Sequence, residues 1–80
     1  MIKYYIKEEN KEPQDITEVK DFDFEKSEYI YQVNTQDSSG SKTYYSRTKD
    51  EAWKSLDYMH FGACYQVYSK LDDVDDMIPF

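Results

Sequence analysis

Residues 48–62, TKDEAWKSLDYMHFG, carry the strongest local signal in the sequence and decide the fold class. Thr48 and Glu51 have the T-x-x-E spacing of a capping box, in which the threonine side chain accepts from the Glu51 amide and the glutamate reaches back. Behind this cap, apolar side chains recur at helical spacing along one stripe of Ala52, Trp53, Leu56 and Met59, with His60 beside them. Gly62 stands where a left-handed residue commonly ends a helix, so the pattern predicts a helix over about residues 49–61.

Alternating segments on both sides of this helix predict β-strands. Residues 2–7 (IKYYIK), 28–36 (EYIYQVNTQ) and 42–47 (KTYYSR) alternate with the period of two that is typical of half-buried strands. Residues 63–71 (ACYQVYSKL) are again rich in strand formers. The turn formers DSSGS at 37–41 separate the second strand from the third and predict a hairpin.

These elements predict an α+β fold: a mostly antiparallel sheet of about four strands with one α-helix, about 49–61, packed on one face. The 80 residues are expected to form a single domain, 1–80, because a chain of this length has no room for two cores. Nine Tyr, four Phe and one Trp supply most of the large apolar surface for that core.

The stretch from 8 to 28 is an acidic connection with nine carboxylates and three lysines. Pro13 interrupts any early regular element. We expect a long connection with one turn of helix or a short edge strand around 16–19, held down by its four sizeable apolar residues, Ile16, Val19, Phe22 and Phe24.

The chain ends in an acidic tail, 72–80, in which four aspartates precede Met-Ile-Pro-Phe. With 17 acidic and 10 basic residues, the net charge is −7. Such a chain is repelled by nucleic acid and by anionic membranes, so the charge favours a basic protein surface as the partner. Solubility alone is the alternative explanation of an acidic composition.

Catalytic and metal-binding patterns are weak. Asp57, His60 and Cys64 provide the residue types of a nucleophile, base and orienting acid, but Gly62 interrupts the helix between the last two. Carboxylates alternate in 21–25 and cluster in 72–76, without the glycine that a calcium loop needs. We therefore expect no enzymatic activity, no metal and no cofactor.

The cellular compartment is read from cysteine usage and hydropathy. A single cysteine excludes an internal disulfide framework and is compatible with a reducing compartment. The first residues contain no apolar run of signal-peptide length, and no segment approaches the length of a membrane span. A cytoplasmic location is expected.

A partner-binding face is the remaining functional pattern, because tyrosine is enriched in binding hot spots and carboxylates suit a cationic surface. The alternative is that outward tyrosine rings only shield a one-sided sheet. The residues predicted to contact a partner are Asp21, Asp23, Glu25, Tyr29, Tyr31, Asp72, Asp73, Asp75, Asp76 and Phe80.

The carboxylates of EENKEPQDITEVKDFDFE (8–25) and LDDVDDM (71–77), with a tyrosine-rich body between them, give the chain a composition that resembles small acidic phage-encoded inhibitors of bacterial defence, the anti-CRISPR and DNA-mimic proteins. The resemblance is one of composition, without a shared motif. It implies a non-enzymatic inhibitor in the host bacterial cytosol that binds a CRISPR effector or another nuclease complex without a cofactor. The alternatives are an immunity or antitoxin-like neutraliser of a nuclease toxin, and a homodimeric interaction module joined through edge strands.

Overall fold

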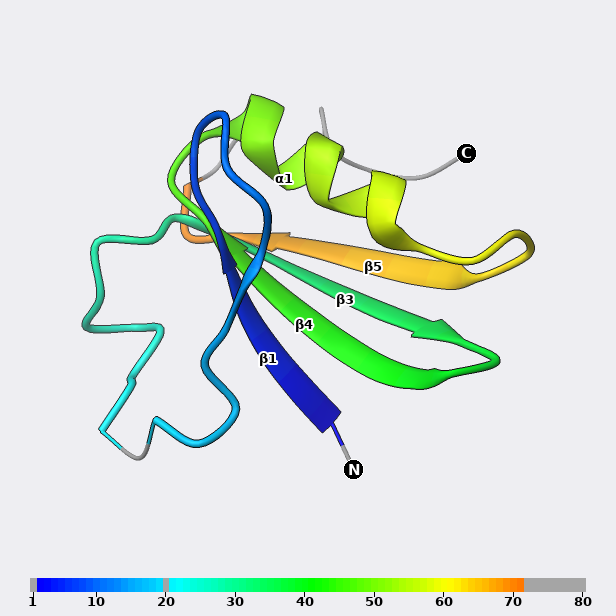
Figure 1. The fold of residues 1–80 in the computed structure, drawn as a ribbon. Helices are drawn as coiled ribbons and strands as arrows, with labels where there is room; N and C mark the ends of the chain where they lie inside the picture. Colours follow the sequence, from blue (N-terminus) through cyan, green and yellow to red (C-terminus); the bar gives the residue numbers. More distant parts are fainter. Residues whose placement is uncertain (1, 20, 72–80) are drawn as a thin grey trace.

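One helix crosses one face of a five-stranded mixed sheet (Figure 1). The computed structural model describes residues 2–19 and 21–71. In chain order, the elements are β1 (Ile2–Lys7), β2 (Gln14–Asp15), β3 (Tyr31–Asp37), β4 (Gly40–Ser46), α1 (Lys49–Ser55), the 3₁₀ turn η1 (Leu56–Tyr58) and β5 (Cys64–Ser69). The strand order is β2-β1-β4-β3-β5. The predicted α+β class is confirmed, but the sheet has five strands rather than about four and is mixed.

The parallel pair is β1 with β4, and the other three pairs are antiparallel. Parallel neighbours cannot be joined by a tight hairpin and need a long crossover. Here the crossover contains the acidic connection, with β2 inside it, and then β3. The additional strand, β2, pairs only Gln14 with Ile6 and Asp15 with Tyr5. Two polar residues cannot produce an alternating pattern, so the sequence did not predict β2. The turn of helix or short edge strand expected around 16–19 is a single turn, in which the Val19 amide donates to the Ile16 carbonyl at 2.9 Å.

The predicted hairpin is confirmed as the β3–β4 pair, whose last partners are Asp37 and Gly40. An Asp37 carboxylate oxygen accepts from the amide of Ser39 at 2.9 Å and from its hydroxyl at 2.7 Å, which closes the turn. Gly40 has a φ of 122°, a conformation that glycine adopts without steric cost.

The helix begins at the predicted residue with half of the predicted capping box, and it ends early. The Glu51 carboxylate binds Lys7 and Lys54 and does not reach back to the Thr48 amide. Thr48 Oγ1 accepts from the Glu51 amide at 3.2 Å. The α-helix stops at Ser55, whose hydroxyl donates to the Ala52 carbonyl at 2.6 Å. That carbonyl is the acceptor that the Leu56 amide would use in a continuing α-helix, and the Leu56 amide instead donates to the carbonyls of Lys54 and Trp53.

The predicted helix end near residue 61 is therefore wrong. Gly62, with a φ of 83°, belongs to a separate turn in which the Ala63 amide donates to the His60 carbonyl at 3.1 Å. This turn redirects the chain from η1 into β5.

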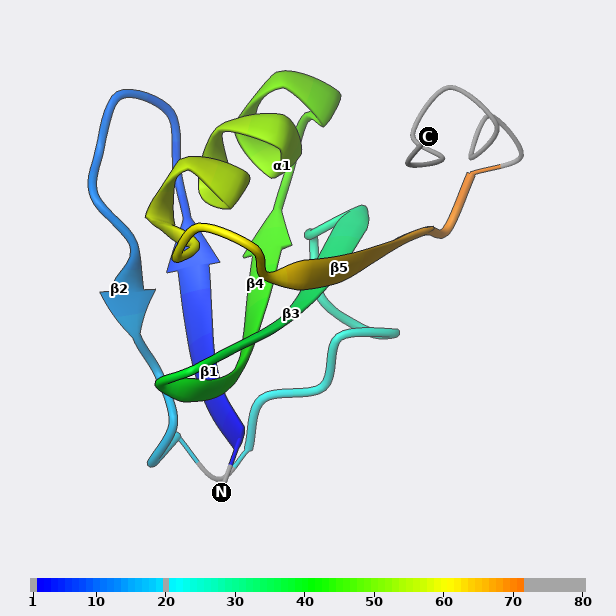
Figure 2. The ribbon, with the colours of Figure 1, turned by 90° about the vertical axis from the view of Figure 1, so that its right-hand side faces the viewer.

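Two apolar clusters lie on opposite faces of the sheet. Figure 2 shows the outer strands of this sheet, β2 on one side and β5 on the other. Beneath α1 the buried residues are Tyr31, Val33, Tyr44 and Ala52, flanked by Tyr5, Ile30, Trp53, Leu56 and Val67. On the far face they are Ile16, Phe24, Tyr29 and Tyr45, flanked by Tyr4, Ile6 and Phe22. The acidic connection thus covers the β1–β4 part of the face that the helix leaves open.

Candidate protein-binding face

Residues 21–28, the acidic segment, alternate exposed carboxylates with rings that pack on the sheet. Phe22 and Phe24 lie with their ring centroids 4.7 Å and 5.1 Å from that of Tyr45 on β4. Between and beside them, the side chains of Asp21, Asp23 and Glu25 are exposed. The two rings bury apolar area and hold the backbone against the sheet, so the three carboxylates are displayed from an anchored strip of chain.

Backbone hydrogen bonds fold the end of this segment into consecutive turns. The Lys26 amide donates to the Asp23 carbonyl at 3.2 Å, and the Ser27 amide donates to the Phe24 carbonyl at 3.1 Å. The Asp23 side chain also accepts from the Glu25 amide at 3.0 Å. These bonds restrict the backbone conformations from which the carboxylates project.

Lys70, the residue after β5, fastens the acidic segment from the other side. Its ammonium group lies 4.5 Å from the centroid of the Phe24 ring, within cation–π range. The same group donates to the Ser27 carbonyl at 3.0 Å and to the Glu25 carbonyl at 3.4 Å. The ammonium group of Lys70 thus contacts backbone oxygens and a ring, and the nearby carboxylates of Asp23 and Glu25 remain exposed to solvent.

Glu28 differs from the three preceding carboxylates because it has a cationic partner. Its carboxylate is paired with the Arg47 guanidinium, which lies 5.2 Å from the centroid of the Tyr29 ring. The hydrogen bond from Arg47 to Glu28 raises the pKa of Arg47. The Tyr29 hydroxyl donates to Glu8 at 3.2 Å, and burial, with this bond, raises the pKa of Tyr29.

Among ion pairs that join two described residues, the remaining ones belong to Glu51, with Lys7 and with Lys54. Asp21, Asp23 and Glu25 take part in none of the pairs within this part of the chain. The acidic segment therefore presents a local negative charge that the described cations do not neutralise by direct contact.

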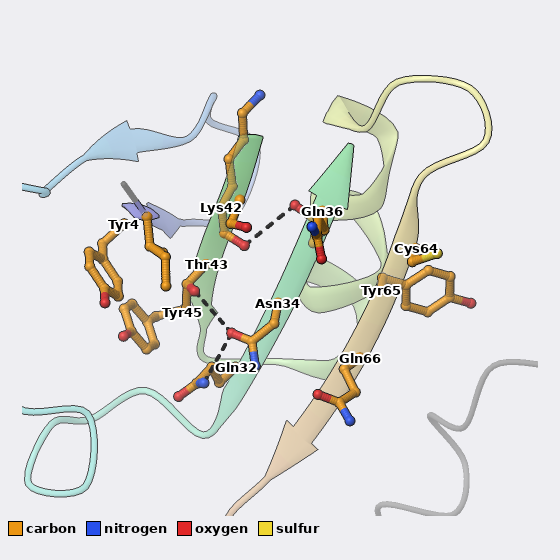
Figure 3. Close-up of a pocket in the computed structure, with 13 residues that line it drawn as sticks. Tyr4, Gln32, Asn34, Gln36, Lys42, Thr43, Tyr45, Cys64, Tyr65 and Gln66 are labelled. Carbon is orange, nitrogen blue, oxygen red and sulfur yellow. Dashed lines mark hydrogen bonds between the residues drawn. The ribbon is translucent and has the colours of Figure 1, made fainter. Parts of the chain in front are cut away.

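Next to the acidic segment, the far face of β4, β3 and β5 carries polar side chains without charge, and we call this surface the amide face. Its members are Gln32, Asn34, Gln36, Thr43, Gln66 and Tyr68. Figure 3 shows the Asn34 amide oxygen accepting from Gln32 at 3.1 Å and from Thr43 at 2.9 Å. All of them except Tyr68 line an open groove of about 610 Å³, which Tyr4 and Tyr45 also line.

The acidic segment and the amide face are contiguous. Phe24 packs on Tyr45 and also meets Tyr68 of β5 edge-on, with the ring centroids 6.0 Å apart. Protein interfaces commonly have a core depleted in charge and a polar, charged rim. The groove is lined mainly by uncharged polar and tyrosine side chains, with Lys42 among its lining residues, and exposed carboxylates border it. This composition is close to that of such an interface.

The structure places the predicted contact residues in three different situations. Asp21, Asp23 and Glu25 are exposed on one segment. Tyr29 and Tyr31 are 6% and 5% exposed and belong to the two apolar clusters, so neither ring is available to a partner. The remaining predicted contacts, Asp72, Asp73, Asp75, Asp76 and Phe80, lie outside the described residues.

Sequence reasoning did not select the amide face, although the alternation of β3 placed Gln32 and Asn34 opposite Tyr31 and Val33. The sequence did hold one signal: the alternate residues of β3 that form this face carry no charge, in a chain with 34% charged residues. That signal becomes informative only with the strand order, because β3 lies between β4 and β5 and the uncharged residues of the three strands form one surface.

Catalytic and metal-binding groups do not converge in the described part of the chain. No group of three or more His, Cys, Asp or Glu residues there has the geometry to hold a metal ion. His60 uses its backbone amide to donate to Asp37 at 3.3 Å. No hydrogen bond between side chains of residues 2–19 and 21–71 joins His60 to Asp57 or Cys64.

Comparison with known proteins gives no match: no family model fits the chain, and neither the curated proteins nor the solved structures contain a significantly similar one. Within the described residues, no helix has the length and apolar character needed to cross a membrane.

Proposed function

We propose that this protein is a non-enzymatic inhibitor that binds a basic, nucleic-acid-handling bacterial protein, of the anti-CRISPR or anti-restriction type, with carboxylates in the positions of phosphates. The observation that carries the proposal is the display of Asp21, Asp23 and Glu25, which alternate with the anchoring rings of Phe22 and Phe24.

The physical basis is electrostatic. A channel that attracts the phosphates of DNA or RNA does so through clustered Lys and Arg, and it attracts any fixed row of anions in the same way. Carboxylates on an anchored backbone lose less conformational freedom on binding than carboxylates on a flexible chain. The acidic segment supplies such anchored groups, and the net charge of −7 adds long-range attraction to a cationic target.

The amide face supports a protein target over a small cation or polyamine. Side-chain amides and Tyr68 can form hydrogen bonds and apolar contacts with a protein surface at the centre of an interface, and the carboxylates can form its rim. The tail aspartates belong to the same proposal as further anionic groups, on the basis of their sequence alone.

The test is affinity capture from a bacterial lysate, with target identification by mass spectrometry and with two baits. One bait is the natural sequence and the other is Asp21→Asn/Asp23→Asn/Glu25→Gln. These substitutions remove three charges but keep the side-chain shapes, and the asparagine at position 23 retains a carbonyl oxygen that can accept from the amide of residue 25. We expect a basic nucleic-acid-binding protein on the first bait and much less of it on the second.

The matched control bait is Glu9→Gln/Glu12→Gln/Asp57→Asn, which removes the same charge from positions outside the acidic segment. It should retain the captured protein. Equal capture by all three baits, or capture only of proteins that do not handle nucleic acid, would contradict the proposal. A cognate nuclease toxin as the captured protein would favour the immunity or antitoxin alternative over a defence complex.

A further inference from the structure

The two edges of the sheet are built differently. The β2 edge is two residues long, follows Pro13 and contains Asp15. Short strands, proline and charge are the devices by which natural proteins prevent edge pairing. The β5 edge has six residues, CYQVYS, and contains neither a charge, nor a proline, nor a glycine. It is the one strand among the described residues without a charged side chain.

The outward hydrogen-bonding groups of β5 follow from its register with β3. The Lys70 amide donates to the Ile30 carbonyl at 3.0 Å, which continues the β3–β5 pairing beyond Tyr31 and Ser69. Inward and outward groups alternate along an antiparallel strand. The amides and carbonyls of Tyr65, Val67 and Ser69 therefore point away from β3, and the sheet as described has no strand beyond them.

We propose that this edge pairs antiparallel with the β5 edge of a second copy of the chain, across a twofold axis at Val67. In that register Val67 faces its own copy, and Tyr65 of each chain faces Ser69 of the other. Each of these three residues then faces a residue whose amide and carbonyl also point outward. Each of the three facing pairs exchanges two backbone hydrogen bonds, which gives about six new ones. The result is one continuous sheet across the dimer.

A second copy fits this edge because the exposed apolar residues at its two ends are complementary under the twofold. Phe61 is fully exposed in the turn before β5, and Leu71 is 50% exposed just after it. Antiparallel pairing at Val67 brings the end of β5 in one chain, which Leu71 follows, to the start of β5 in the other chain, which the turn with Phe61 precedes. Leu71 of one chain and Phe61 of the other therefore lie at the same end of the paired strands. The pairing thus covers two apolar groups that the single chain leaves in water.

The dimer is independent of the proposed inhibition, and salt separates the two. Each copy has a net charge of −7, so salt screens repulsion between copies and should strengthen the dimer. Binding to a basic target should instead weaken as salt rises. If the chain fails to dimerise, its binding to a basic target can still be measured, and the reverse also holds.

The test uses Cys64, the single cysteine, which is exposed. Spin labels attached there report the distance between the two copies by pulsed electron resonance, and labelling also prevents disulfide artefacts. With the axis at Val67, the two Cys64 positions lie six residues apart along the paired strands, so their Cα atoms are separated by about 20 Å. Light scattering on the same sample should give twice the chain mass.

The variant that tests the end contacts is Phe61→Ser/Leu71→Ser, and its control is Val19→Ser, which changes another exposed apolar residue. We expect the first to raise the dimer dissociation constant at least tenfold and the second to leave it unchanged. A chain that remains monomeric at millimolar concentration and high salt overturns the proposal. A dimer with a Cys64 distance well outside the expected one overturns the β5 pairing.

Discussion

The ammonium group of Lys7, at the end of β1, lies 2.7 Å from the carboxylate of Glu51 in the first turn of α1, and the two side chains are only 5% and 4% exposed. This pair ties the strand that makes the parallel contact to the helix above it. The hydrogen bond from Lys7 holds the pKa of Glu51 below its ordinary value. Lys7 also donates to the carbonyl of Glu8 at 2.9 Å, where the acidic connection starts.

Removing one member of this pair should cost more than removing both. Lys7→Met leaves the Glu51 carboxylate buried without its main cation, and we expect unfolding free energy to fall by about 3–5 kcal/mol. The double variant Lys7→Met/Glu51→Leu should recover a large part of that loss, because no buried charge remains. Denaturant unfolding measures both values.

The matched control is Lys54→Met, which removes the other cation near Glu51. Lys54 is 54% exposed and 3.5 Å away, so its loss should change stability by no more than about 0.5 kcal/mol. The double variant Lys7→Met/Glu51→Leu can be compared with its two single substitutions. If its loss of unfolding free energy equals the sum of the two single losses, Lys7 and Glu51 do not act as a buried pair.

The hairpin turn should have a distinct pH signature at Asp37. The hydrogen bond from the Ser39 hydroxyl, with further bonds from the Ser39 and His60 amides, lowers the pKa of Asp37 from 3.8 to about 2. A lowered pKa means that the carboxylate stabilises the fold above pH 3.8 and that this contribution disappears as the pH falls toward 2.

A carboxyl-carbon NMR titration measures that pKa directly. Ser39→Ala should move the pKa of Asp37 upward toward its ordinary value, since the largest contribution is lost. Ser38→Ala, one residue earlier in the same turn, should leave it in place. An unshifted Asp37 in the natural sequence would contradict the turn geometry.

Phe24 should be the main anchor of the acidic segment, because it is 8% exposed and touches Tyr45, Tyr68 and Lys70. Phe24→Ala should lower the unfolding free energy by about 3 kcal/mol through lost burial and a residual cavity. Amide hydrogen exchange of Ser27 should accelerate, since its amide donates to the Phe24 carbonyl. Val19→Ala, at an exposed apolar site, should change stability by no more than about 0.5 kcal/mol.

The elements that sequence predicted well are those specified by local chemistry. The alternation of 2–7, the turn formers before Gly40 and the Thr48 cap each act within a few residues, and each appears where expected. The end of the α-helix was missed because the chain continues as a 3₁₀ turn over Leu56–Tyr58, and the change, which the bond from Ser55 to the Ala52 carbonyl accompanies, leaves the apolar spacing of the sequence unaltered. The parallel β1–β4 pair was missed because alternation defines a strand's faces and does not identify its neighbours.

The candidate site was predictable to a similar degree. Asp21, Asp23 and Glu25 were selected for their charge, and the structure shows their side chains exposed between the phenylalanines. Their contact with a partner stays a prediction. Tyr29 and Tyr31 were misplaced because the sheet is covered on both faces: Tyr31 of β3 packs beneath α1, and Tyr29 packs with Phe24 and Tyr45 on the other face. Tyrosine pairs such as Tyr44-Tyr45 consequently fill two clusters, and fewer rings remain for a partner.

The role of the acidic segment is tested by the salt dependence of affinity for the captured target, measured by calorimetry. The three proteins compared are the natural chain, Asp21→Asn/Asp23→Asn/Glu25→Gln, and the Glu9→Gln/Glu12→Gln/Asp57→Asn control. We expect affinity to fall steeply with salt for the natural chain and the control. The acidic-segment variant should bind at least tenfold more weakly, with a shallower salt dependence. Salt-independent binding, or equal weakening in the two variants, would contradict a role for the acidic segment.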